Sequence, residues 1–367
     1  MAAQLPLLVG MAEPEQRPEP APPQNNIVGL NLARLHQPQY VWAAGQIANA
    51  NGGSWGYVTI LLTNQDRSSG LPEHLLQQLL DRCYEARLQP IVRVGTRFDS
   101  GTGIWDRPTD DDPALWRALF ERVKWPNSTV WVIPANEPNL GREWGGVVDV
   151  PSYARYLERF IHVFSSSTRF KVVNGPLNLS NPHYPPESVD AFEFLAEHMA
   201  LTPHVFENLP AWASNSYKID GIGEGPRFTH LGYQVELEQI GREMPVIVTE
   251  SGVLHRHGEE EIAQFFVDAY RDWQADPRVI AATPLSWDPD YDKHWMFTLD
   301  EQGNVETTSP TYRALRSLPR VAGSPNNPPP FGNTPRMSSA KSRPQPIFLP
   351  EPAPSISGLD EARDLAP

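Results

Sequence analysis

Two glutamates follow apolar runs that are predicted to be buried strands. Glu137 follows VWVIPA within an Asn-Glu-Pro tripeptide, and Glu250 is the last residue of PVIVTE. A carboxylate at the end of a buried strand costs free energy unless it is paired or used in chemistry. Two carboxyls in one cleft can cleave a glycosidic bond, because one donates a proton to the leaving oxygen while the other attacks the anomeric carbon. The pair therefore predicts acid/base chemistry on a glycoside.

The chemistry of such a pair depends on the distance between its carboxyl groups. Two neighbouring carboxylates raise each other's proton affinity, so an ionised Glu250 would help to keep Glu137 protonated. Carboxyls about 5–5.5 Å apart are typical of enzymes that retain the anomeric configuration, and carboxyls about 6.5–9.5 Å apart of enzymes that invert it. Singly, each glutamate has an ordinary structural explanation, because Pro138 is common after a strand and Glu250 could cap the next segment.

The elements that would position these glutamates alternate along the chain. Short apolar or β-branched runs predict eight strands, at 26–31, 56–62, 90–94, 129–135, 170–174, 211–217, 245–250 and 280–287. Apolar residues at three- and four-residue steps predict helices at 71–88, 113–123, 153–165, 188–199, 230–241, 259–273 and 311–318. The run after the first strand, from His36, has no clear helix cap.

This order of elements indicates the fold class. Nearly continuous apolar strands are typical of a parallel sheet that is covered on both faces. Eight strand–helix units predict an α/β fold, the (β/α)8 TIM barrel, whose functional residues lie at the carboxyl ends of the strands. A doubly wound open sheet is the alternative, but no Gly-rich phosphate loop follows the first strand.

The two ends of the chain differ from its middle in composition. Six of the 39 prolines lie in residues 1–25 and eleven in residues 321–367, and neither stretch shows hydrophobic periodicity. Such sequences cannot bury enough apolar surface to offset chain entropy. We therefore expect a disordered Pro-rich segment at 1–25, a barrel domain at 26–320 and a disordered Pro-rich tail at 321–367.

Over residues 26–320, Asn-Glu-Pro after the fourth strand and a glutamate after the seventh resemble glycoside hydrolase clan A, the 4/7 superfamily. The resemblance implies a retaining glycosidase that cleaves β-linked poly- or oligosaccharides, with Glu137 as general acid/base and Glu250 as nucleophile. It also implies substrate-binding residues: Asn136 at the sugar 2-hydroxyl, Tyr217 after strand six, Trp287 after strand eight, and an early arginine, Arg93 or Arg97. Many members carry a histidine two residues before that tyrosine, where this chain has Asn215.

Composition limits the partners. The formal net charge is -14 and the pI is near 5.2, which argues against nucleic acid and anionic membrane surfaces as partners. No run reaches the roughly 18 apolar residues of a membrane span. The single cysteine, Cys83, is predicted to be a small core residue. We expect a carbohydrate partner, no cofactor and no metal, while the oligomeric state stays open.

The cell compartment is indicated by the resemblance alone. Clan A membership would imply an extracellular or cell-surface location. The apolar run at residues 5–12 is short and has no basic flank before it, so it does not resemble a signal peptide.

Two other functions are compatible with the same patterns. A barrel that binds glycans without cleaving them would share the strands and the Pro-rich tail. A metal-dependent hydrolase could use His255 and His257, whose His-x-His spacing is typical of metal ligands. In metal-dependent barrel hydrolases such a pair lies on the first strand, whereas here it follows the seventh in a polar loop. No series of carboxylates at suitable strand ends completes a ligand set, so the sequence disfavours a metal site.

Overall fold

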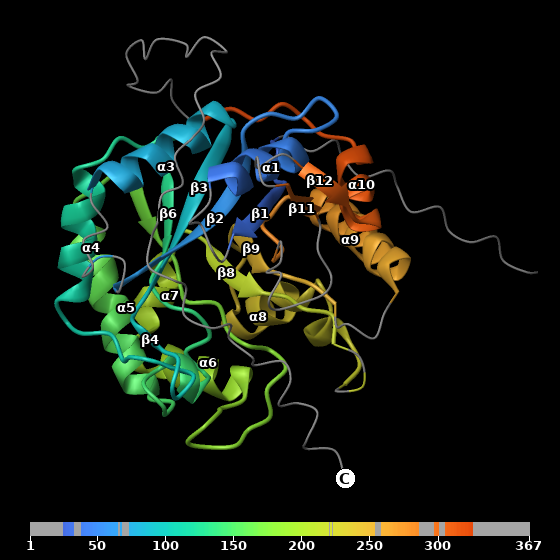
Figure 1. The fold of residues 1–367 in the computed structure, drawn as a ribbon. Coiled ribbons are helices and arrows are strands. Elements are labelled where there is room, and N and C mark those ends of the chain that lie inside the picture. The colour runs from blue at the N-terminus through green and yellow to red at the C-terminus, as the bar shows by residue number, and fades with distance from the viewer. Residues whose placement is uncertain are drawn as a thin grey trace, which may run out of the picture.

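The computed structural model describes residues 25–32, 38–64, 67, 73–219, 221, 223–253, 258–285, 297–300 and 305–325. A ring of strands lies at the centre and helices surround it (Figure 1). The strands of the ring are β1 (Gly29–Leu32), β2 (Gly56–Thr63), β3 (Leu88–Gly95), β6 (Val130–Ile133), β7 (Phe170–Val172), β8 (Trp212–Asn215), β9 (Val246–Glu250) and β10 (Val279–Ala282). Each overlaps one of the eight predicted strands, and the predicted α/β barrel is confirmed.

The helices of the outer layer also match the predicted order. They are α3 (Glu73–Glu85), α4 (Asp112–Glu121), α5 (Val150–Phe164), α6 (Ala191–Leu201), α8 (Gly232–Ile240), α9 (Glu259–Ala275) and α10 (Pro310–Ser317). The helix after the first strand, for which the sequence showed no clear cap, is α1 (Pro38–Ala48), and α7 (Pro203–Asn208) was not predicted. Both begin at a proline, which suits the first helical turn because its missing N–H would have no partner there.

Shorter elements lie in the loops between the ring strands and the helices. They are the hairpin of β4 (Phe98–Asp99) and β5 (Ile104–Trp105), the 3-10 turns η1 (Gly141–Glu143) and η2 (Pro226–Phe228), and the hairpin of β11 (Phe297–Leu299) and β12 (Val305–Thr308). The β4–β5 hairpin and η1 both lie in loops that follow ring strands, β3 and β6. Loops of this kind carry the functional residues of a barrel.

The ring closes at two seams between its hydrogen-bonded sheets. The strand order is β1-β2-β3-β6-β7 in one sheet and β10-β9-β8 in the other. At the first seam, Val28 pairs in parallel with Ala282, and Asn31 pairs in parallel with Leu285. At the second, the Asn174 side chain replaces ladder bonds, because its amide donates to the Ala213 carbonyl at 2.8 Å and accepts from the Ala213 N–H at 2.7 Å.

The interior of the barrel changes from apolar to polar along its axis. Inward-facing side chains lie two residues apart along a strand. The apolar layer consists of Tyr57, Ile91, Ile133, Val173, Ala211, Ala213, Ile247 and Ala281. Two residues further on, five of these strands carry buried polar side chains, Thr59, Arg93, Asn215, Thr249 and Thr283. Polar groups therefore collect at the carboxyl end of the barrel.

The helices bury apolar faces against the outside of this ring. In α5, the Asp149 carboxylate caps the first turn by accepting from the Ser152 N–H at 2.9 Å, and Leu157 and Phe160 are fully buried. Cys83 of α3 is fully buried in the same layer, as predicted. Among the described helices, none has the length and apolar character of a membrane span.

The predicted terminal segments lie almost entirely outside the described residues. Asn25 and residues 321–325 are the exceptions, and in the latter Ala322 pairs with Ser54 and the Gly323 N–H donates to the Ser54 carbonyl at 2.8 Å. This contact ties the chain after α10 to the end of the barrel where β2 begins.

Candidate active site

Glu250 is the last residue of β9, and its carboxylate is held by donors from three other strands or loops. Arg93 of β3 forms an ion pair with it, and the Tyr217 hydroxyl donates to it at 2.9 Å. The Asn31 amide, at the end of β1, lies 3.4 Å from the same carboxylate. Glu250 is 8% exposed, so these contacts compensate a charge that burial would otherwise penalise.

An irregularity in β9 turns this glutamate toward the barrel axis. The register between β8 and β9 shifts there, because Ser214 pairs with Val248 whereas Asn215 pairs with Glu250. Such a bulge adds one residue and re-aims the side chains beside it. As a result, both Thr249 and Glu250 contribute to the polar interior, although adjacent strand residues normally face opposite sides.

Glu137 lies at the start of the loop after β6, in an uncommon backbone conformation. Its φ is 36°, in the left-handed region that residues with a side chain rarely adopt. The Glu137 N–H donates to the Pro176 carbonyl at 2.9 Å, and the Leu140 N–H donates to the Glu137 carbonyl at 2.9 Å. These two bonds hold the strained turn and direct the carboxyl into the site.

The carboxyl of Glu137 is buried and favours the protonated form. Burial, and after it the negative charge of Glu250, raise the pKa of Glu137 above its ordinary range. Arg142 and hydrogen bonds from Asn215 and Asn178 act in the opposite direction. A raised pKa favours the protonated carboxyl, which is the form that can donate a proton to a leaving group.

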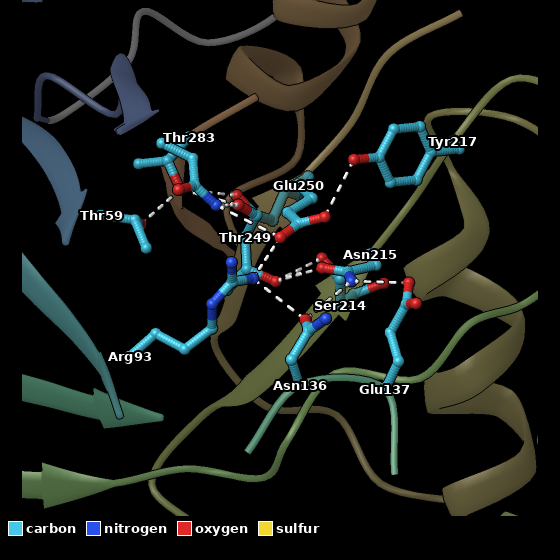
Figure 2. A network of polar contacts seen from close by, with 12 residues as sticks. Thr59, Arg93, Asn136, Glu137, Ser214, Asn215, Tyr217, Thr249, Glu250 and Thr283 are labelled. Carbon is cyan, nitrogen blue, oxygen red and sulfur yellow. Dashed lines mark hydrogen bonds and ion pairs between the residues drawn. The ribbon is translucent and has the colours of Figure 1, made fainter. Parts of the chain in front are cut away.

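Three side chains connect the two glutamates (Figure 2). The same Arg93 nitrogen that contacts Glu250 donates to the Asn136 amide oxygen at 3.0 Å. The Asn215 amide lies 3.4 Å from that oxygen and donates to the Glu137 carboxylate at 3.1 Å. The two carboxyls therefore belong to one continuous polar network, with Asn136 at its centre.

Three buried threonines form hydrogen bonds that hold this network in place. The Thr249 hydroxyl donates to the Asn215 side-chain oxygen at 2.8 Å, which directs the Asn215 N–H2 group toward Glu137. Thr283 and Thr59 share a hydrogen bond of 2.7 Å, and the Thr283 hydroxyl lies 3.2 Å from the Thr249 carbonyl. The three threonines are fully buried, so their hydrogen bonds are made without competition from water.

The structure brings together most of the residues that the sequence singled out. Glu137, Glu250, Asn136, Tyr217 and Arg93 all belong to the network (Figure 2). The alternative arginine does not, because Arg97 pairs with Asp106 at 2.9 Å where both side chains are about half exposed.

Trp287, His255 and His257 lie outside the described residues. In the described ranges, no group of three or more His, Cys, Asp or Glu side chains is arranged to hold a metal ion.

The sequence analysis assigned no role to three residues of the site, Asn31, Asn215 and Glu143. Asn215 is the last residue of β8 and Asn31 is the last but one of β1, and a position near the carboxyl end of a ring strand is the signal that could have identified them. Glu143 was missed because it lies in η1, six residues beyond Glu137, where no strand pattern points to it. Burial, and then the charge of Glu137, raise the pKa of Glu143 to about 7.

Solved structures share this fold, whereas no protein-family model and no curated protein matches the chain. A GH128 (subgroup II) endo-β-1,3-glucanase from Sorangium cellulosum aligns with a TM-score of 0.52 and 15% identity, over 80% of this chain and 98% of the other. A GH39 enzyme from Xanthomonas axonopodis pv. citri aligns with a TM-score of 0.56 and 14% identity, over 81% and 67%. A fungal β-1,4-galactanase aligns with a TM-score of 0.51 and 11% identity, over 76% and 90%.

These likenesses define a class of fold. All three structures belong to glycoside hydrolases, and the chain shares their (β/α)8 barrel fold. At such low identities the likeness establishes the fold, while the chemistry must be argued from the side chains of this chain.

Proposed function

We propose that this protein is a retaining glycoside hydrolase that cleaves β-linked sugars, with Glu137 as general acid/base and Glu250 as nucleophile. The main support for this proposal is the network that joins these two buried carboxyls through Arg93, Asn136 and Asn215. It gives the two groups different surroundings, which is how a site assigns different roles to two carboxyls.

Each environment suits one role. Glu250 is contacted by a guanidinium and a phenol hydroxyl, and these donors match a carboxylate that must be ionised to attack carbon. Glu137 is buried and its pKa is raised, which matches a group that must first give up a proton. The structures that share the fold include an endo-β-1,3-glucanase and β-1,4-galactanases, which supports a glycoside as substrate.

The reaction proceeds in two displacements. Glu250 attacks the anomeric carbon, the bond to the leaving oxygen breaks, and Glu137 transfers its proton to that oxygen. Water then attacks the anomeric carbon of the glycosyl ester, Glu137 accepts its proton, and Glu250 leaves as a carboxylate. Two inversions at one carbon retain its configuration.

Azide rescue of two alanine variants tests both assignments. Activated aryl β-glycosides are hydrolysed by each variant with and without sodium azide, and the product configuration is read by NMR. Glu137→Ala should form a β-glycosyl azide, because azide replaces the water that needs a base. Glu250→Ala should form the α-azide, because azide then attacks the sugar directly from the face that the nucleophile occupied.

Glu207→Gln is the matched control, because Glu207 is exposed and lies on α7. It should retain wild-type rates and give no azide product. Full hydrolysis of unactivated glycosides by both alanine variants would contradict the assignment. A wild-type protein that binds oligosaccharides but releases no reducing ends would contradict the activity itself and favour a glycan-binding barrel.

A further inference from the structure

A small pocket lies beside Arg93 and Asn136 at the carboxyl end of the barrel. Its wall also includes Trp105 of β5, Glu143 of η1 and the adjacent Trp144. The backbone N–H of Gly145 donates to the Trp105 carbonyl at 2.9 Å, so the β4–β5 hairpin and the segment after η1 are joined. The pocket is therefore built from two loops that are fixed to each other.

Glu143 is a buried carboxyl in this wall that the proposed reaction does not use. Its side chain is 5% exposed, and the nearest cation, Arg142, lies 3.8 Å away. It accepts a hydrogen bond from the Asn136 side chain, whose own oxygen accepts from Arg93. A carboxylate has about four acceptor positions. Glu143 thus keeps capacity to accept further hydrogen bonds from a ligand in the pocket.

Donors in the same wall lack acceptors. Nε of Arg93 and the indole N–H groups of Trp105 and Trp144 are buried and have no hydrogen-bond partner among the described residues. A buried donor without an acceptor destabilises the protein, unless a ligand or water supplies one. A small side-chain movement that uncovers these nitrogens would let a ligand satisfy them.

We propose that this pocket binds hydroxyl groups of a neutral sugar, and that Glu143 selects such sugars over uronic acids. A hydroxyl can donate to Glu143 and accept from an indole N–H at the same time. The carboxylate of a uronic acid could only accept, and above pH 7, where Glu143 is mostly ionised, the two like charges would repel each other. An ammonium group could only donate, and would leave the indoles of Trp105 and Trp144 without acceptors. This inference rests on the proposed glycosidase function.

The charges around the pocket agree with a neutral ligand. Carboxyls of Glu137, Glu143 and Glu250 lie in or beside it, against the guanidinium groups of Arg93 and Arg142. The Arg93 guanidinium is already bound to Glu250 and Asn136, so its charge is compensated. A further anion would therefore enter a site without a free counter-charge among these groups.

Glu143→Gln and Trp105→Phe test the assignment, with Glu207→Gln as the control. The substrates are the neutral aryl β-glycoside that the wild-type protein cleaves fastest and the aryl glycuronide of the same ring stereochemistry. Glu143→Gln should raise KM for the neutral glycoside about tenfold with kcat within about threefold, and should lower the neutral-to-uronide ratio of kcat/KM about tenfold. Trp105→Phe keeps the ring but removes the N–H, and should raise KM only.

The outcomes separate this inference from the proposed function. If Glu250→Ala abolishes hydrolysis while Glu143→Gln and Trp105→Phe behave like Glu207→Gln, the pocket assignment is wrong and the function stands. If Glu143→Gln lowers kcat but changes neither KM nor the neutral-to-uronide ratio of kcat/KM, the pocket assignment is also wrong, because Glu143 would then act on the chemical step. If the wild-type protein cleaves no glycoside, both the function and this inference fail. Equal melting temperatures of the variants and wild type verify that folding is intact.

Discussion

Asn215 lies at the point where the two glutamates are connected. It donates to the Glu137 carboxylate, and its own side-chain oxygen accepts from the Thr249 hydroxyl. Because an asparagine amide can be flipped in either sense, the Thr249 donor is what fixes the Asn215 N–H2 group toward Glu137. A neutral amide here stabilises the carboxylate of Glu137 without adding a charge.

Asn215→Ala should shift the pH dependence of hydrolysis. The Asn215 hydrogen bond lowers the pKa of Glu137, so its removal should raise that pKa further. We expect the alkaline limb of kcat/KM, which reports deprotonation of the general acid, to move to higher pH. Its midpoint is measured over pH 4–10, with the exposed Asn208→Ala as control. An unchanged or lower midpoint would show that Asn215 does not act on Glu137.

At the scale of elements, β8 and α8 enclose a further buried carboxyl, outside the candidate active site. Glu236 of α8 is fully buried and accepts a hydrogen bond from the Ser214 hydroxyl. Ser214 lies 2.9 Å from the Ser216 hydroxyl, which accepts from the Tyr233 N–H at 3.1 Å. This cluster anchors the end of β8, the strand that presents Asn215. Burial raises the pKa of Glu236 from 4.5 to about 8.

Glu236→Gln should remove part of the pH dependence of stability. Between pH 4.5 and about 8 the folded protein retains a proton on Glu236 that the unfolded chain releases, so the free energy of unfolding falls as pH rises through this window. The glutamine variant keeps the acceptor for Ser214 but cannot titrate. Relative to wild type it should gain of the order of a few kcal/mol between pH 5 and pH 8.5.

Urea unfolding at these two pH values measures the difference. Glu238→Gln, on the exposed face of the same helix, is the matched control and should follow the wild-type curve. If Glu236→Gln loses stability equally at both pH values, Glu236 does not titrate in this window.

At the scale of the whole molecule, the barrel is closed by contacts between residues far apart in the sequence. β1 meets β10 through Val28 and Ala282, and the segment after α10 returns to Ser54 before β2. The last of these contacts involves Ala322 and Gly323, two and three residues beyond the barrel end expected from proline content.

A protein of residues 25–325 should therefore fold and act like the full chain. The sequences removed are Pro-rich and lack hydrophobic periodicity, so their loss should remove no buried apolar surface. We expect the melting temperature to change by less than about 3 °C, and kcat/KM to stay within about twofold. A shorter protein ending at residue 320 should melt at a lower temperature. Loss of activity in the 25–325 protein would show that a terminal segment takes part in function.

The amino-acid sequence by itself determined the order of strands and helices and the pair Glu137 and Glu250. Apolar periodicity is local, so it is readable without knowing which strands pair. The carboxyl ends of parallel strands share one face, so glutamates that end two such strands are predicted to meet. Where local signals were weak, as at α1 and α7, the helices form because tertiary burial stabilises them.

Only the tertiary structure decided which neighbours the glutamates have. Arg93 rather than Arg97 faces Glu250, since Arg93 is inward on β3 whereas Arg97 lies beyond the strand and pairs with Asp106. Asn31 joins the site because β1 closes the ring beside β10, the neighbour of β9, and Glu143 joins it because the segment of η1 is bonded to the β4–β5 hairpin. Such contacts depend on ring closure and on the bulge in β9. Both arise from packing between distant segments, which no local pattern encodes.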